Sequence, residues 1–267
     1  MTRTHPRTQC DELLVARDGA VIEVTFNRPH RHNAFTTAMY DALQQLLEQV
    51  EHDEQARVVL MRGAGSVAFA AGNDISEFAG MTTGREAVVY ETRVRDMLAH
   101  LAHLPQVTLA VIDGLCVGGG LAVATYCDLR LCTAHSRFGY PIARTLGNAL
   151  SRPLLERCVH VFGEPLSREM LLASRMVDAH RAYGVGAVMH VAATAHDLDR
   201  EVRSLVEGLL QAAPLTLQAT KQQLSEITAP GGDPEHDDRL LEKVYASEGF
   251  REGVRAFLAK ERPNFPG

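Results

Sequence analysis

The sequence predicts an α/β fold, and three observations support this expectation. Between residues 20 and 133, segments rich in β-branched residues alternate with segments whose apolar residues recur at helical spacing. The chain has 267 residues, of which 46% are hydrophobic and 22% charged, so it is long enough for one large domain with a substantial core. Turns of small residues at 70–72 and 118–120 each follow a predicted strand, as strand-to-helix connections often do.

The first half of the chain supplies most of the alternation. Residues 20–29 are rich in β-branched residues and end at Pro29, which predicts a strand. From residue 36 to residue 50, apolar residues recur at helical spacing behind Thr36 or Thr37, either of which can cap the helix. The further elements expected before residue 134 are a strand, a helix and two strands: 57–63, 85–103, 106–114 and 128–133.

The second half of the chain is mostly helical beyond about residue 150. Residues 227–238, "ITAPGGDPEHDD", have the composition of a linker, and the stretch after them predicts one or two amphipathic helices. We therefore expect a flexible tail over residues 1–10, an α/β core over 11–200 and a C-terminal helical region over 201–267.

Charge and composition exclude several classes of partner. The net charge of −6 and the pI near 6.1 argue against nucleic acid as the main partner. No apolar run approaches the length of about 18 residues that spans a membrane, and the first ten residues contain no signal-like apolar segment. We expect a cytoplasmic protein that contacts no membrane and whose five cysteines are reduced thiols.

The three consecutive glycines at 118–120 are the first candidate for a functional site. A strand that enters a helix through such a turn leaves backbone N–H groups unpaired at the helix N-terminus, where negative charge is favoured. The Rossmann, P-loop and nucleophile-elbow motifs are all absent here. Close packing of the helix against a strand explains the glycines equally well when they are taken alone.

A second small-residue turn, Ala70–Gly72, strengthens the functional interpretation. It also follows a strand-like segment, and Asn73 and Asp74 come directly after it. Two such turns can each direct one backbone N–H at a single carbonyl oxygen. Together they predict an oxyanion hole.

Several segments, in order along nearly the whole chain, resemble the crotonase, or enoyl-CoA hydratase/isomerase, superfamily. They are "FNRPHRHNAF" (26–35), "FAAGNDISEF" (69–78), "DGLCVGGGLAVATYCDLRLCT" (113–133), "SRFGYP" (136–141) and "ASEGFREGVRAFLAKERPNF" (246–265). The resemblance implies a crotonase-type ββα spiral core and a C-terminal helical region that forms homotrimers or dimers of trimers. It also implies acyl-CoA thioester substrates, held at the carbonyl by the backbone N–H groups of Asn73 and Gly119.

The same resemblance implies where coenzyme A would lie as part of the thioester. The backbone contacts to its nucleotide would come from Ala71, Asp74, Ile75 and Ser76. Many relatives have Lys at the Ser76 position. Arg28, His30, Arg31 and Lys260 are candidates for contacts with the CoA phosphates, or are ordinary surface charges. We expect no bound metal, flavin or nicotinamide, because ligand clusters and dinucleotide fingerprints are missing.

The pattern departs from that of the family's hydratases at the two positions that carry glutamates there. One position, two residues after the glycines, is Ala122, and the other is Ile142, or Ala143 if one residue is inserted. From residue 114 to residue 155 the only acidic side chain is Asp128, whereas the chain average predicts about five. Because each positioned acid or base contributes roughly 10²–10⁴-fold in rate, we expect hydration to be slow.

Other side chains are candidates for the missing chemistry, and each has a plainer alternative. Tyr140 is the candidate catalytic group beside Ile142, although a phenol is a poor base and packing would also explain it. Histidine is a common general acid or base, but His135 is expected to be exposed, and Arg144 could pair with a substrate carboxylate or form a salt bridge. Residues expected where relatives line the acyl pocket, or else on a solvated helix face, are Glu77, Glu86, Tyr90 and Glu91. We expect Asp128 to brace the fold.

Three functions remain open from the sequence. The first is an acyl-CoA enzyme that stabilises a thioester enolate and carries out isomerisation, decarboxylation, C–C cleavage or thioester hydrolysis with other acid–base groups. The second is a protein that binds acyl-CoA without turning it over, and the third uses the glycine turns for packing only. A titratable side chain in the pocket beside Asn73 and Gly119 would favour the enzyme.

Overall fold

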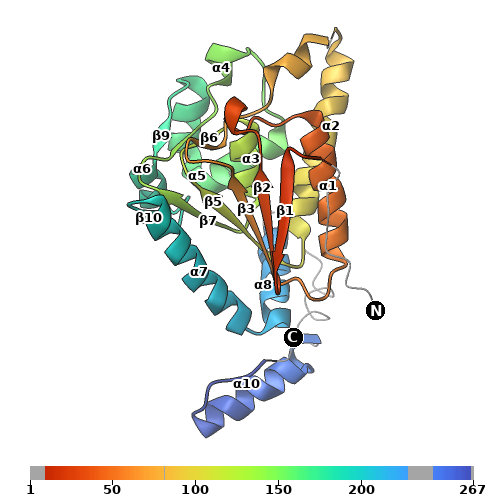
Figure 1. Cartoon of the computed structure of the whole chain (residues 1–267), viewed down its shortest axis with the longest axis vertical. Helices are drawn as coiled ribbons and strands as arrows, with labels where there is room; N and C mark the ends of the chain where they lie inside the picture. The colour runs from red at the N-terminus through yellow and green to blue at the C-terminus, as the bar shows by residue number, and fades with distance from the viewer. Residues whose placement is uncertain (1–9, 81, 228–242, 266–267) are drawn as a thin grey trace.

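Two β-sheets and a set of surrounding helices make up the protein (Figure 1). The structure, a computed structural model, describes residues 10–80, 82–227 and 243–265. The α/β class expected from the sequence is confirmed. The expected N-terminal tail, apart from Cys10, and the linker at 227–238, apart from Ile227, lie outside the described residues.

The larger sheet has six strands in the order β1-β2-β3-β5-β7-β10. β1 is antiparallel to β2 and every other pair is parallel. The strands are β1 (Leu13–Asp18), β2 (Val21–Phe26), β3 (Val58–Gly63), β5 (Val107–Ile112), β7 (Leu129–Thr133) and β10 (His190–Ala192). Parallel strands need crossover connections, which explains why the sequence alternates strand and helix.

Both faces of this sheet are covered, and the residues of β3 show how. Val59 and Met61 belong to one buried cluster with α1 (Thr37–Glu51) and α2 (Gly84–His103). Val58 and Leu60 belong to a second cluster with α7 (Ala195–Gln211). Because side chains alternate across a strand, this two-sided burial produces the continuous apolar run that predicted β3.

The smaller sheet has four strands in the order β4-β6-β8-β9, and it places the glycine turns. The strands are β4 (Ala68–Ala70), β6 (Leu115–Val117), β8 (Arg137–Gly139) and β9 (Val177–Asp178). β4, β6 and β8 are parallel, so β4 and β6 both end at the same edge, where their glycine turns begin. α3 (Gly119–Tyr126) starts directly after the second turn.

The predicted elements of the first half are confirmed, and the differences have local causes. Thr36 caps α1 by accepting a hydrogen bond from the Met39 N–H, as expected. The segment predicted as one strand over 106–114 ends at Ile112, and the chain then moves to the other sheet as β6. β1 was not expected, because it is an edge strand in which Leu13 is the only fully buried residue.

The second half is mostly helical, as predicted. Its helices are α4 (Ile142–Thr145), α5 (Arg152–Leu172), α6 (Ala179–Gly184), α7, α8 (Pro214–Ile227) and α10 (Glu248–Ala259). α7 crosses the expected boundary at residue 200, and Val202 and Val206 pack on the large sheet. In the described part of the chain, none of the helices combines the length and apolar character needed to cross a membrane.

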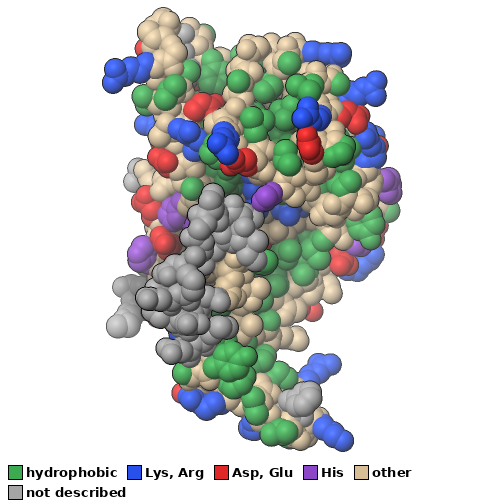
Figure 2. Space-filling view, turned by 180° about the vertical axis from the view of Figure 1, so that it is seen from behind, with side chains coloured by type: hydrophobic (Ala, Val, Ile, Leu, Met, Phe, Trp, Pro, Cys, Tyr) green, Lys and Arg blue, Asp and Glu red, His purple; other side chains and the backbone are tan. Residues whose placement is uncertain are grey.

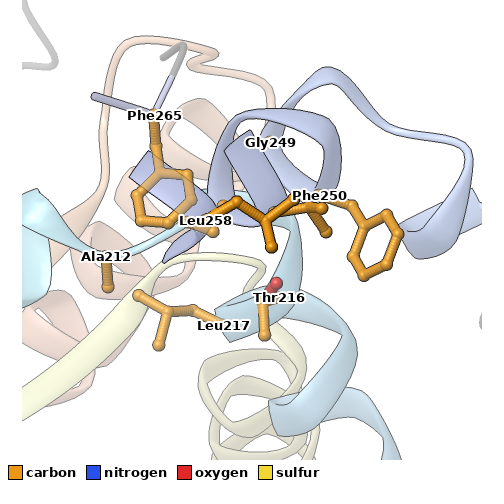
Figure 3. Close-up of a pocket in the computed structure, with 10 residues that line it drawn as sticks. Ala212, Thr216, Leu217, Gly249, Phe250, Leu258 and Phe265 are labelled. Carbon is orange, nitrogen blue, oxygen red and sulfur yellow. The ribbon is translucent and has the colours of Figure 1, made fainter. Parts of the chain in front are cut away.

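α10 lies beyond the end of the core (Figure 1), and hydrophobic side chains gather on this lower part of the molecule in Figure 2. An apolar groove lies between α10 and the start of α8. Side chains from the start of α8 and from α10 face each other across it (Figure 3). The groove has a volume of about 540 Å³. Phe250, Val254 and Leu258 of α10 line it and are exposed.

Asp128, at the start of β7, ties three elements together. Its carboxylate accepts hydrogen bonds from the Thr108 N–H and hydroxyl of β5 at 2.7 and 2.9 Å. It also forms an ion pair of 2.8 Å with Lys221 of α8, whose ammonium group donates to the Gln106 carbonyl at 2.8 Å. The Lys221 side chain is only 9% exposed, so its charge depends on these partners.

We expect Asp128→Asn to lower the free energy of unfolding by about 2–3 kcal/mol, because it leaves the buried Lys221 ammonium without a counter-charge. Urea denaturation at neutral pH measures the change. The matched control is Glu156→Gln, which removes an exposed ion pair with Arg152 and should alter stability by less than about 0.5 kcal/mol. Equal effects of the two substitutions would contradict the bracing role.

Candidate active site

The two glycine turns pack directly against each other. Gly72 follows β4 with φ 106°, and Gly118 follows β6 with φ 52°, both in the left-handed region that favours glycine. A Cβ atom on Gly118 would lie 3.3 Å from the Gly72 Cα. Backbone therefore meets backbone at this point, with no side chain between the turns.

The two glycines that follow Gly118 are required by the same contact. A Cβ on Gly119 would overlap the Asn73 side-chain oxygen and the Tyr40 hydroxyl. A Cβ on Gly120 would overlap the Ala70 carbonyl oxygen and side chain. The glycines therefore allow close packing of the two turns. The same packing brings the turns close enough to share one ligand atom.

Each turn presents a backbone N–H that has no protein acceptor within the described residues. Phe35 pairs with the first turn, donating its N–H to the Gly72 carbonyl at 2.8 Å and accepting from the Asp74 N–H at 2.7 Å. Because N–H directions alternate along an extended segment, the Asn73 N–H between them points to the opposite side. The Gly119 N–H opens α3, where the helix dipole favours negative charge.

Tyr40 of α1 holds the first turn in place and was not expected from the sequence. Its hydroxyl donates to the Asn73 side-chain oxygen at 2.7 Å, and its ring stacks on Phe35 at 4.9 Å between centroids. Burial raises the pKa of the Tyr40 phenol well above its ordinary value, so it remains a proton donor in this bond. In the sequence Tyr40 is indistinguishable from an ordinary core residue of an amphipathic helix.

A cavity of about 150 Å³ opens beside Asn73 and Gly119. Most of its walls are apolar, formed by Val94, Val117, Leu146, Leu150 and Leu154 among others. Ala122 and Ile142 also line it, so the two positions singled out in the sequence do lie at this site. Neither brings an ionisable group.

Two ionisable side chains stand among the residues lining this cavity, Tyr40 and Glu91. Glu91 lies on α2, one turn before Val94, and is half-buried. Burial raises the pKa of the Glu91 carboxyl, and the positive charge of Arg95 opposes the shift. Of the four residues expected at the acyl pocket, Glu91 is the one that lines it.

The other three have structural partners. The Glu77 carboxylate accepts hydrogen bonds of 2.6 Å from the Thr37 N–H and hydroxyl. Glu86 forms a capping box at the start of α2 with Thr83. The Tyr90 ring packs edge-on against Phe78 and Tyr40.

Tyr140 is not among the residues that line the cavity. It follows β8 and is 1% exposed, within the main core cluster. Burial raises the pKa of its phenol well above the ordinary value. This placement gives the expected catalytic role of Tyr140 no support, and that role stays a prediction. His135 and Arg144 are also outside the lining; His135 is exposed and pairs with Asp113 at 3.1 Å.

The residues expected to contact CoA fall into two groups. Ala71 and Ile75 line the cavity. Asp74 and Ser76 bond each other, with the Asp74 carboxylate accepting a 2.7 Å hydrogen bond from the Ser76 hydroxyl. The Ser76 bonds, together with an ion pair of 2.8 Å to Arg28, lower the pKa of Asp74 to about 2. These residues keep the backbone after the first turn fixed.

The basic residues are not gathered around the site. Arg28 is buried, pairs with Glu12 and Asp74 at 2.8 Å each, and donates to the Ala34 carbonyl. These ion pairs hold the Arg28 side chain against the protein, and its expected contact with the CoA phosphates stays a prediction. Arg31 is exposed on the short helix η1 (Pro29–Arg31). Lys260 follows α10, which Figure 1 shows at the opposite end of the molecule from α4.

Two backbone N–H groups without a protein acceptor in the described chain therefore lie beside one largely apolar cavity. A family model described as "Enoyl-CoA hydratase/isomerase" matches residues 16–267. The chain belongs to the enoyl-CoA hydratase/isomerase family. Within the described ranges, no group of three His, Cys, Asp or Glu side chains could hold a metal ion.

Individual relatives agree with this assignment. The chain is 30% identical over 258 residues to "2,3-dehydroadipyl-CoA hydratase" of Escherichia coli (strain K12), with 96% of this chain and 99% of that protein covered. It is 28% identical to "Enoyl-CoA hydratase domain-containing protein 2, mitochondrial" of Homo sapiens, with 95% and 88% covered. A crystal structure of an "enoyl-CoA hydratase/ carnithine racemase" from Magnetospirillum magneticum matches with a TM-score of 0.91 at 32% identity over 97% of both chains. The predicted crotonase-type fold is confirmed.

We expect Gly120→Ala to lower the free energy of unfolding by about 1–3 kcal/mol, because its Cβ has to displace the Ala70 backbone. Gly208→Ala in α7 is the control, since its Cβ would meet open space and alanine favours the helix by up to about 1 kcal/mol. Thermal and urea denaturation of both variants test the contact. A Gly120→Ala protein as stable as the wild type would contradict it.

Proposed function

We propose that this protein is an acyl-CoA-processing enzyme that stabilises a thioester enolate at the backbone N–H groups of Asn73 and Gly119. The observation that carries the proposal is the meeting of the two turns at the cavity, with both N–H groups lacking a protein acceptor in the described chain. When a proton leaves the carbon next to a thioester, the carbonyl oxygen becomes negative. Two positioned donors and a helix N-terminus stabilise that charge.

The remaining contacts of the substrate follow from this placement. The acyl chain occupies the apolar cavity, and the CoA moiety extends along the backbone of Ala71, Asp74, Ile75 and Ser76. Arg31 and Lys260 are the candidates for the phosphates, with Lys260 acting from a neighbouring subunit, because its own chain places it far away. Coenzyme A enters as part of the substrate, and the proposed chemistry uses no other cofactor.

Efficient hydration is not part of the proposal. Adding water to a double bond needs one group to activate the water and another to deliver a proton to carbon. Ala122 and Ile142 line the cavity but neither can do this. We therefore assign this chain a reaction that uses fewer acid–base groups than hydration.

The alternative is a protein that binds acyl-CoA without turning it over. The observation in its favour is the replacement of acid–base side chains by Ala122 and Ile142 in an otherwise apolar cavity. The presence of Glu91 in the same lining favours the enzyme. Binding and turnover measured side by side separate the two functions.

The first experiment pairs calorimetric binding with a hydration assay on a short and a long trans-2-enoyl-CoA. We expect the short thioester to bind more tightly than free CoA, which lacks the acyl group, and to be hydrated several powers of ten more slowly than by a two-glutamate hydratase assayed in parallel. Rapid hydration would contradict the conclusion that Ala122 and Ile142 make hydration slow. Failure of every thioester to bind would overturn the substrate class.

We also propose that the helical region over residues 201–267 joins subunits into a trimer or a dimer of trimers. The support within this chain is α10, whose Phe250, Val254 and Leu258 leave an apolar groove exposed beside α8. An exposed apolar surface of this kind is typical of an interface between subunits. Burying this groove between subunits would also place Lys260 of one subunit close to another subunit.

We expect Leu258→Glu to reduce the assembled mass measured by sedimentation velocity, because it places a charge in the proposed interface. Leu258 is 76% exposed in the single chain, and Leu172 of α5, 75% exposed, is the matched control. Leu172→Glu should leave the mass unchanged. A wild-type protein that sediments as a monomer would contradict the assembly.

A further inference from the structure

Glu91 differs from the other carboxylates near the site in having no partner. Glu77 accepts from Thr37, and Glu86 accepts from the N–H groups of Thr82 and Thr83. Within the described chain, the Glu91 carboxylate makes neither a hydrogen bond nor an ion pair, although Arg95 is close enough to influence it. A half-buried carboxylate without a partner costs free energy when it is ionised.

Glu91 and the two turns border the same cavity. Asn73, Gly119, Tyr40 and Glu91 all line this cavity of about 150 Å³. The Tyr40 hydroxyl bonds the Asn73 side chain at 2.7 Å, and the charge of Glu91 contributes to the raised pKa of that phenol. A carbonyl oxygen held at the two N–H groups therefore places the adjoining carbons in the cavity that Glu91 lines.

We propose that Glu91 is the proton-transfer group of this site, removing a proton from the substrate carbon next to the thioester carbonyl and returning it to the acyl chain. This inference rests on the proposed function, because it uses the carbonyl position set by Asn73 and Gly119. Glu91 is the only carboxyl group among the residues that line the cavity.

The proton transfer balances without another reactant. As the Cα–H bond breaks, an O–H bond forms on Glu91 and the electron pair moves onto the carbonyl oxygen, giving an enolate. In a 3-enoyl thioester the enolate extends over the double bond, and the electron pair then forms a C–H bond at Cγ as the Glu91 O–H bond breaks. Glu91 ends ionised as it began, and the double bond has moved into conjugation with the carbonyl.

A single carboxyl group suits this one-proton shift, since the same group acts as base and then as acid. The apolar walls of the cavity suit the acyl part of the substrate. The substrate class that fits is therefore a 3-enoyl-CoA.

The surroundings of Glu91 suit a group that titrates during turnover. On α2 its titratable neighbours are Tyr90 and Arg95, and from α1 Tyr40 faces it. The lining from α3 and α4, including Ala122, Ile142 and Thr145, carries no charge. Burial raises the pKa of the Glu91 carboxyl above its ordinary value, and the positive charge of Arg95 opposes the shift.

The test compares the wild-type protein with Glu91→Gln in two assays. One follows exchange of the Cα protons of butanoyl-CoA in deuterated water by NMR, which reports proton removal alone. The other follows conversion of a short trans-3-enoyl-CoA to its conjugated isomer. We expect both rates to fall by roughly 10²–10⁴-fold in Glu91→Gln while calorimetric binding of butanoyl-CoA changes little.

Two further readouts separate a proton-transfer role from a structural one. Because the pKa of Glu91 is raised on folding, its ionised form destabilises the folded protein above the ordinary glutamate pKa, so Glu91→Gln should be at least as stable as the wild type at pH 7. The wild-type exchange rate should rise with pH through one ionisation above the ordinary glutamate pKa. The control, Glu86→Gln on the same helix, should lose stability and keep its exchange rate, because Glu86 caps α2 and does not line the cavity.

The outcomes distinguish this inference from the proposed function. If the wild type exchanges Cα protons and Glu91→Gln exchanges them within about threefold of that rate, Glu91 is not the proton-transfer group, and the oxyanion site stands. If the wild type binds butanoyl-CoA but exchanges no protons, both the enzyme proposal and the role of Glu91 fail, and the binding protein remains. If Glu91→Gln loses Cα proton exchange and Glu86→Gln keeps it, the inference is supported.

Discussion

The structure depends on one close contact, in which two glycine turns from parallel strands meet backbone to backbone. Gly72 and Gly118 approach until a Cβ on Gly118 would lie 3.3 Å from the Gly72 Cα, and Gly119 and Gly120 have no room for a side chain. This approach places the N–H groups of Asn73 and Gly119 beside one cavity. The small sheet brings these turns together because β4 and β6 are parallel and end at the same edge.

The cavity around that contact limits the chemistry. Its lining is mostly apolar, and Ala122 and Ile142 contribute no ionisable group to it. An apolar wall strengthens the interaction between a developing oxyanion and its two donors, since less water screens it. The same wall makes a carboxylate without a partner costly to ionise, and burial raises the pKa of Glu91.

Much of the fold follows from local pattern. Apolar spacing and the positions of threonines predict β3, β5, α1 and α2, and these four elements lie within two residues of their expected bounds. The strand expected over 20–29 ends three residues earlier, at Phe26. β1 was not expected because it is too exposed on one face to show an apolar period. The pairing of short strands such as β4 and β6 into a second sheet was not expected either, because strands of three residues show no pattern that identifies their neighbours.

The sequence by itself determined the α/β class, the family resemblance, the two glycine turns and the absence of acids at positions 122 and 142, because these are properties of residue type and order. Tertiary structure alone decided which polar side chains reach the site. Tyr140 packs in the core, Arg28 forms ion pairs with Glu12 and Asp74, and Glu91 lines the cavity. Helical spacing tells which residues share a face, but what that face meets depends on elements distant in sequence.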